Sequence, residues 1–352
     1  MYKQRIFLAA VLTGLLLTVL SFQTFAQVDK QQGCDYLNFK TPGSYQAGGV
    51  QMIKLIEGYK VWTKRFGNGP IKVLLLHGGP AMTHEYMECF ESFFPKAGIE
   101  FYEYDQLGSY YSDQPDNDSL WVLDRFVDEV EQVRKALGLN KDNFYLLGNS
   151  WGGLLAMEYA AKYQQNLKGL IICNMVSSFD KYVVYNTKLR NQLRPSLLDS
   201  FKVFEEKGDF QNPVYQDLVV KEYYHRHICR LLQWPEPVLR SFKHINQHVY
   251  EFMQGPSEFV PGGNLEGWTI TDRLKNITVP TLAVGAKYDT MNPEDMKEIS
   301  EAVQNGRYLY CPNGSHLAMW DDQEVFMNGV IKFITDVQNG EFPGKIGSVN
   351  SN

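Results

Sequence analysis

Short apolar runs alternate with longer amphipathic stretches through most of this chain. Four runs are nearly continuous, as expected for strands buried on both faces of a parallel sheet. They cover residues 71–77, 99–105, 143–149 and 167–174. Between them, residues 124–138 and 152–163 repeat apolar positions at helical spacing, and Gly138 is a stop signal. This alternation predicts an α/β fold with a mostly parallel central sheet and helices on both faces.

Two departures from this alternation predict how the chain is divided. Residues 50–56 and 59–66 flank Glu57-Gly58 and predict a hairpin ahead of the parallel strands. After Ser178 the strand runs stop, and the chain becomes aromatic, basic and helical until a Gly/Pro-rich stretch. The alternation then resumes with strands at 279–289 and 307–312, a helix from about Pro293 and a last helix at 323–337. We therefore expect four parts: core residues 27–178, a helical cap at 179–270, core residues 271–338 and a flexible tail at 339–352.

The first 26 residues have the pattern of a secretory signal peptide. Lys3 and Arg5 precede an apolar run at residues 6–20, and small residues up to Ala26 offer a cleavage site. A membrane anchor is the competing interpretation, but 15 uncharged residues fall short of the roughly 20 that span a bilayer. The expected mature protein is periplasmic or secreted, without stable membrane association.

Charge and cysteine content exclude several classes of function. The formal charge of −6 becomes −8 when Lys3 and Arg5 are removed, and no basic cluster remains, so nucleic acid is a poor partner. Five scattered cysteines predict neither a disulfide framework nor a metal site, although up to two pairs could form. Cys173 and Cys311 lie in strand-like runs and are expected in the core. His225 and His227 are two positions apart in a helical stretch and would point to different helix faces, so they are not expected to bind a metal as a pair. No cofactor or metal is expected, and the oligomeric state stays open.

The segment "YLLGNSWGGLLAMEYA" at residues 145–160 carries the strongest chemical signal. It places Ser150 between Gly148 and Gly152, in the G-x-S-x-G pattern of a nucleophile elbow, with a strand before it and a helix after it. Side chains two positions either side of the serine would obstruct so sharp a turn. The following helix points its first N–H groups towards developing negative charge.

A serine nucleophile needs a base, an acid and two oxyanion donors. In this architecture the chain order is Ser, Asp or Glu, then His. Asp289 and His316 follow the later strands in that order, and the expected donors are the N–H groups of Gly79 and Trp151. The competing interpretations are a helix-capping turn at Asp289, a surface loop at His316 and a simple turn at "HGGP". His77 and His84 are expected to shape the glycine loop.

Several longer segments resemble one enzyme family, the proline iminopeptidases of the α/β-hydrolase fold, and especially its tricorn-interacting branch. The matching segments are "LLLHGGPAMTHEYM", "FYEYDQLGSYYSDQPD", "LLGNSWGGLLAMEYA", "GPSEF", "GWTITDRL" and "CPNGSHLAMWDD". The resemblance runs from about residue 45 to 337 and includes the cap. It implies a serine aminopeptidase that releases an N-terminal residue, often proline, from short peptides.

The resemblance also implies how the substrate amine is bound. In the family acidic residues hold the amine, and the glutamate of the cap motif matches Glu258. A second acidic position corresponds here to Thr290, which predicts weaker or altered amine recognition unless Glu222 or Glu251 compensates. A further departure is Tyr110, which replaces the second glycine of the family's Gly-x-Gly-x-Ser and is expected to change the rim of the pocket.

Three functions follow from these residues. The first is a serine aminopeptidase acting on short peptides with a free N-terminus. The second is an esterase or amidase on the same scaffold, which Thr290 favours and which would accept N-acetylated substrates. The third is a non-catalytic binding module, against which the intact Ser150, Asp289 and His316 argue.

Overall fold

A computed structural model describes residues 47–343 of the 352-residue chain. One eight-stranded sheet forms the core, in the order β1-β2-β4-β3-β5-β6-β7-β8. The strands are β1 (Ala47–Lys54), β2 (Lys60–Phe66), β3 (Ile71–Leu76), β4 (Ile99–Asp105), β5 (Phe144–Asn149), β6 (Gly169–Cys173), β7 (Thr281–Ala286) and β8 (Gly306–Cys311). β1 and β2 form the predicted antiparallel hairpin, and the strands from β4 onward pair in parallel. The predicted α/β architecture is confirmed.

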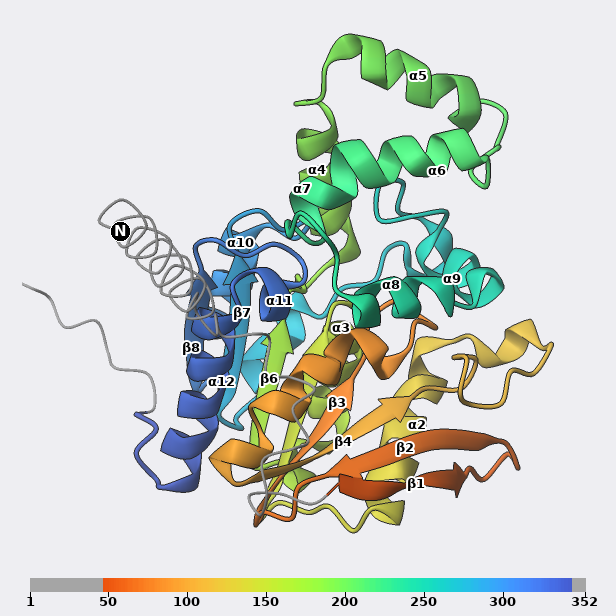
Figure 1. The fold of residues 1–352 in the computed structure, drawn as a ribbon. Coiled ribbons are helices and arrows are strands. Elements are labelled where there is room, and N and C mark those ends of the chain that lie inside the picture. Colours follow the sequence, from red (N-terminus) through yellow and green to blue (C-terminus); the bar gives the residue numbers. More distant parts are fainter. Residues whose placement is uncertain (1–46, 344–352) are drawn as a thin grey trace, which may run out of the picture.

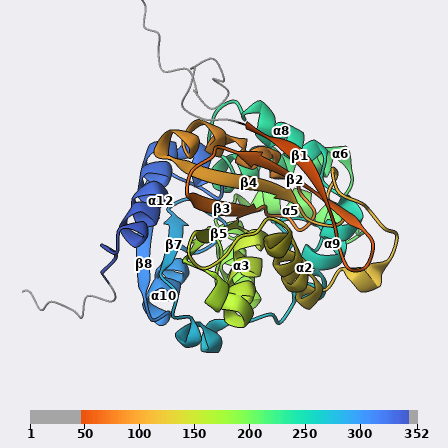
Figure 2. The ribbon, with the colours of Figure 1, turned by 90° about the horizontal axis from the view of Figure 1, so that it is seen from below.

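Helices cover both faces of this sheet (Figure 2). They are α2 (Leu123–Ala136), α3 (Trp151–Tyr163), α10 (Pro293–Ala302), the short α11 (Ala318–Asp321) and α12 (Gln323–Gln338), with the 3₁₀ segment η2 (His84–Ser92). Side chains of successive strand residues point to opposite faces of the sheet. Leu146 packs on the side of α2 and α3, and Leu147 packs on the side of η2 and α12. Strands buried on both sides explain the continuous apolar runs of the sequence.

A helical layer lies between β6 and β7 in the chain and above the carboxyl ends of the strands (Figure 1). Its helices are α4 (Phe179–Arg190), α5 (Pro195–Glu205), α6 (Pro213–Val219), a π-helical turn η6 (Val220–Tyr224), α7 (His225–His227), α8 (Glu236–Lys243) and α9 (Gln247–Gln254). We refer to residues 179–270 as the cap. Because parallel strands end at one edge, the loops after β3, β5, β7 and β8 all meet beneath it.

Candidate active site

Ser150 lies at the sharp turn between β5 and α3. Its backbone has φ 57° and ψ −128°, a conformation that costs a non-glycine residue energy. The flanking glycines are sterically required, because a Cβ on Gly148 would lie 1.9 Å from the Gly152 carbonyl oxygen. A Cβ on Gly152 would lie 2.1 Å from the Leu76 carbonyl oxygen. The strained turn therefore lifts Ser150 out of the sheet edge at the start of α3.

Asp289 and His316 form a buried pair after β7 and β8. The His316 Nδ1 lies 2.7 Å from Asp289 Oδ1, and the His316 backbone N–H donates to the carbonyl of His227 in the cap. Burial disfavours the imidazolium, but the adjacent Asp289 carboxylate outweighs it, so the pKa of His316 lies above its ordinary value. With Nδ1 directed at the carboxylate, Nε2 is the nitrogen left to accept a proton.

Asn174 holds the other oxygen of Asp289, a contact that the sequence pattern did not indicate. Its Nδ2 donates to Asp289 Oδ2 at 2.7 Å and to the Ser315 carbonyl at 3.2 Å. Asn174 directly follows β6 and has φ 54°, a left-handed conformation that asparagine tolerates better than most residues. The only local signal was an asparagine at the carboxyl end of a parallel strand.

Gly78 and Gly79 bring the loop after β3 against Ser150. A Cβ on Gly78 would lie 2.9 Å from the Ser150 Cβ, so only glycine allows this approach. The Gly78 N–H donates to the Tyr86 hydroxyl at 2.6 Å, which in turn donates to Asn149 Oδ1 at 2.9 Å. Within residues 47–343, no protein acceptor takes the backbone N–H of Gly79 or Trp151.

Gln106 connects this loop to the helix that follows Ser150. Its Oε1 accepts from the Trp151 indole at 2.7 Å, and its backbone N–H donates to His77 Nε2 at 3.1 Å. Burial lowers the pKa of His77, so its ring is neutral and Nε2 is an acceptor. His84 anchors the same region through Asp105, 2.7 Å from its Nδ1. Both histidines shape the loop, as predicted.

A cavity of about 150 Å³ brings the separate parts together. Gly79, Ser150 and His316 line it from the core, and Tyr224, Phe242 and Glu258 are among the residues that line it from the cap. Ser150, His316 and Glu258 are each less than a tenth exposed. The structure therefore places the predicted nucleophile, base, one oxyanion donor and the predicted amine ligand on one enclosed space. Their roles stay predictions.

Glu258 lies on the cap side of this cavity and is held by two tyrosines. Tyr182 donates to Oε2 at 2.5 Å, and Tyr250 donates to Oε1 at 2.8 Å. Burial, together with the Glu258 charge, raises the pKa of both tyrosines, so both remain neutral donors. Among residues 47–343, the carboxylate is thus oriented without a cationic partner. The sequence pattern indicated neither of these tyrosine contacts.

Thr290 lies against the pair of Asp289 and His316 and is not among the residues that line the cavity. Its hydroxyl donates to Asp289 Oδ1 at 3.3 Å and lies 3.4 Å from His316 Nδ1. Glu222 pairs with two arginines of the cap, and Glu251 accepts from Gln247, whose own side chain lines the cavity. Glu258 is the carboxylate among these that reaches the cavity.

The remaining candidate residues are not among those that line the cavity. His227 Nδ1 contacts the Tyr288 carbonyl at 2.8 Å, and the His225 ring lies beside Trp234. Cys173 and Cys311 are buried free thiols, as predicted for core residues, while Cys34 and the predicted signal peptide lie outside the described residues. In the described part of the chain, no cluster of three or more His, Cys, Asp or Glu could hold a metal. No helix there combines the length and apolarity needed to cross a membrane.

Comparison with known proteins places this site in a family. A family model described as the alpha/beta hydrolase fold matches residues 72–323. A proline iminopeptidase of Flavobacterium johnsoniae is 63% identical over 283 residues, covering 80% of this chain and 95% of that protein. One from Elizabethkingia meningoseptica is 62% identical over 290 residues, covering 82% and 97%. The crystal structure of the Mycobacterium smegmatis proline iminopeptidase is 27% identical, with a TM-score of 0.74 over 83% of this chain and 99% of that one.

Proposed function

The chain belongs to the proline iminopeptidase family of α/β hydrolases, and on that premise we propose that it is a serine aminopeptidase that releases N-terminal proline from short peptides. One observation carries the proposal. Glu258, a buried carboxylate that has no cationic partner in the described part of the chain, shares one cavity with Ser150 and His316. A substrate bound there by its ammonium group presents its first peptide bond to the serine.

The reaction follows from the positions of these groups. His316 Nε2 takes the Ser150 proton as Oγ attacks the carbonyl carbon, and Asp289 stabilises the resulting imidazolium. The backbone N–H groups of Gly79 and Trp151 donate to the oxyanion. His316 then protonates the leaving nitrogen, and an acyl-enzyme on Ser150 remains. Water, deprotonated by His316, attacks this ester, releases free proline and restores the serine.

The cavity also suits the ring of proline. Phe242, Tyr224 and Tyr250 give one side of it an aromatic surface, while Glu258 supplies the negative charge. A pyrrolidinium ion is a compact cation with apolar faces, so it matches both features. Cation–aromatic contact adds about 0.5–2 kcal/mol when the cation is desolvated.

The deciding experiment compares proline-arylamide with its N-acetyl form on the purified protein. We expect the protein to hydrolyse the free-amine substrate and to discriminate strongly against the acetylated one. Ser150→Ala should hydrolyse neither substrate, while its circular dichroism spectrum stays that of the wild-type protein. Equal turnover of the two substrates would instead indicate the esterase or amidase alternative. Undiminished turnover by Ser150→Ala would refute the serine mechanism.

Export to the periplasm or the medium is part of the same proposal. It is supported by the basic residues, apolar run and small residues of positions 1–26. Expression with the native leader, followed by mass spectrometry of the product's N-terminus, tests it. A mature protein that begins at Gln27 is expected, and retention of Met1 in the cytoplasm would contradict export.

A further inference from the structure

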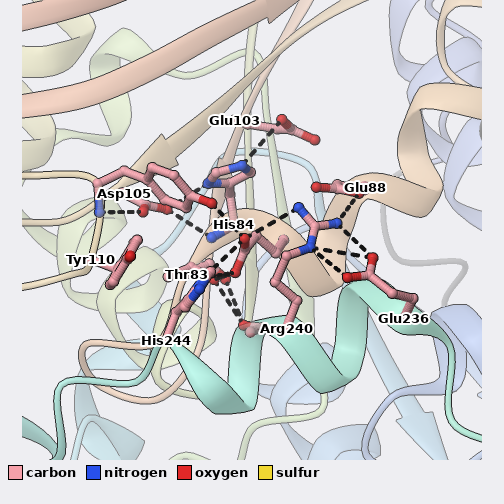
Figure 3. Close-up of polar contacts among 12 residues, drawn as sticks. Thr83, His84, Glu88, Glu103, Asp105, Tyr110, Glu236, Arg240 and His244 are labelled. Atoms are coloured by element: carbon pink, nitrogen blue, oxygen red, sulfur yellow. Dashed lines mark hydrogen bonds and ion pairs between the residues drawn. The ribbon is translucent and has the colours of Figure 1, made fainter.

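Glu85 is a buried carboxylate at which the cap contacts the core. Figure 3 shows this junction, with Thr83 and Glu88 on the core side and Arg240 and His244 on the cap side. It lies in η2 and is fully inaccessible to solvent. From the core it accepts hydrogen bonds from the Thr83 hydroxyl and the Tyr111 hydroxyl, each at 2.7 Å. From the cap, Arg240 lies 3.2 Å and His244 Nδ1 lies 2.9 Å from its oxygens. One carboxylate therefore joins two segments that are more than 150 residues apart in the chain.

Neighbouring contacts tie the same two segments together. The ring of Tyr110 stacks on His244, with centroids 4.0 Å apart and planes 6° from parallel. Arg240 also donates to Glu88 at 2.9 Å, and Ser241 donates to the Thr83 carbonyl at 3.2 Å. We call this set of residues the Glu85 latch. Its members are Thr83, Glu85, Glu88, Tyr110, Tyr111, Arg240, Ser241 and His244.

The latch lies next to the wall of the substrate cavity. Phe242, Ile245 and Gln247 line that cavity, and they alternate along the chain with the latch residues Ser241 and His244. On the core side, Met82 lines the cavity and precedes Thr83. The Asn246 N–H donates to the Ala81 carbonyl at 3.0 Å, directly beside these residues. Loosening of the latch would therefore move the cavity wall.

We propose that Glu85 is a positioning residue for substrate binding, which acts by holding cap residues 240–247 against residues 81–88. This inference rests on the proposed function, because it assigns residues 242–247 to the wall of the substrate site. Ser150, Asp289 and His316 follow core strands, and the cap residue that His316 contacts through its backbone is His227, which lies outside residues 240–247. If the latch opens, only a fraction of molecules has a complete site, and apparent affinity falls in proportion to that fraction. The chemical step within a complete site stays the same.

Glu85→Gln tests the proposal, because it keeps the shape of the side chain and removes its charge. We expect the KM for proline-arylamide to rise about tenfold, corresponding to one lost charge-assisted hydrogen bond, while kcat stays within about twofold. Amide hydrogen exchange of residues 240–247 should become faster in the same variant. Glu236→Gln is the matched control, since Glu236 also contacts Arg240 but is 69% exposed at its side chain, and both readouts should be unchanged.

Two results would overturn the proposal: an unchanged KM with faster exchange, or a fall in kcat with an unchanged KM. His244→Gln and Tyr110→Ala are the variants to measure if Glu85→Gln does not fold, and each should raise KM by a smaller factor. Failure of the proposed function is distinguishable, because it shows in the wild-type protein as indifference to N-acetylation. In that case the effect of the latch is measured by hydrogen exchange of residues 240–247 and by the rate at which a fluorophosphonate labels Ser150. Unchanged values of both in the variants would refute it.

Discussion

Two buried glutamates at the junction of core and cap, Glu258 and Glu85, have opposite surroundings. Within the residues that the structure describes, the Glu258 carboxylate accepts only from neutral tyrosine hydroxyls, and it lies on the cavity. Glu85 receives Arg240 and His244 besides its two hydroxyl donors, and it does not line the cavity. The first carboxylate is oriented while its charge stays available to a ligand. The charge of the second is matched by protein groups and serves to hold two segments together.

The comparison shows why burial alone does not identify a binding carboxylate. A buried charge must be paired or strongly hydrogen-bonded, and the choice of partners decides what it can still do. Neutral donors satisfy the carboxylate without cancelling its attraction for an ammonium group. Cationic donors neutralise the charge of the carboxylate, so the carboxylate holds protein segments together and no longer attracts an ammonium group. Three further variants sharpen this distinction.

Glu258→Gln should have the largest effect. The amide keeps the shape of the side chain but cannot form a charge-assisted hydrogen bond with a substrate ammonium, worth about 1.5–3 kcal/mol. We expect the preference for proline-arylamide over its N-acetyl form to fall about ten- to hundredfold. Glu85→Gln is the matched variant and should leave that preference intact while raising KM. If the two variants lose the preference equally, the distinction between these glutamates is wrong.

Asn174→Gly tests a third buried carboxylate, Asp289, which has His316 on one oxygen and a neutral amide on the other. Glycine adopts the positive φ of position 174 freely, so the substitution removes the amide without straining the backbone. Loss of this hydrogen bond should lower kcat about tenfold, because a hydrogen bond that orients Asp289 and contributes roughly 1.5 kcal/mol is removed. Steady-state kinetics with proline-arylamide measures it, alongside the thermal midpoint. An unchanged kcat would show that Asn174 only fills space.

Glu103→Gln tests a fourth carboxylate, which accepts no hydrogen bond within the described residues and has only a long ion-pair contact with His84. Within the described residues, both Glu103 oxygens lack a hydrogen-bond partner, and the His84 Nε2 is 3.9 Å away. Burial raises the pKa of Glu103, so the folded state keeps a proton that the unfolded chain releases near pH 4.5. Stability is therefore lost as the pH rises through the folded-state pKa. His84 adds a loss of the same sign, since Asp105 outweighs burial and raises its pKa from 6.5 to about 9.

Urea unfolding between pH 5 and 9.5 measures this effect. The wild-type free energy of unfolding should fall with rising pH across that range, and Glu103→Gln should fall less steeply up to about pH 7, the folded-state pKa of Glu103. At pH 8 the variant should be more stable by about 1–2 kcal/mol, because its amide, unlike the carboxylate, carries no charge that burial disfavours. Glu301→Gln, whose side chain is 64% exposed, is the control and should follow the wild-type curve. Identical slopes for Glu103→Gln and wild type would contradict the assignment.

The elements of the fold were predictable because their signals are local. Continuous apolar runs marked the strands, and Gly148 and Gly152 marked the turn at Ser150 within five residues. The order of Ser150, Asp289 and His316 also followed from the chain, because each lies in the turn or loop that follows a parallel strand of the sheet. Helical periodicity gave the cap its class of structure, but it did not reveal which cap residues face the core.

By itself, the sequence determined the α/β sheet, its helical cover, the strained serine turn and the family to which the chain belongs. Only the tertiary structure decided that Asn174 reaches Asp289 across 115 positions, that Thr290 contacts Asp289 and His316, and that Glu85 binds the cap. Each of these contacts depends on strand register and on how the cap docks. A short window of sequence encodes backbone conformation and apolar periodicity, but it does not encode which distant donor meets a buried carboxylate.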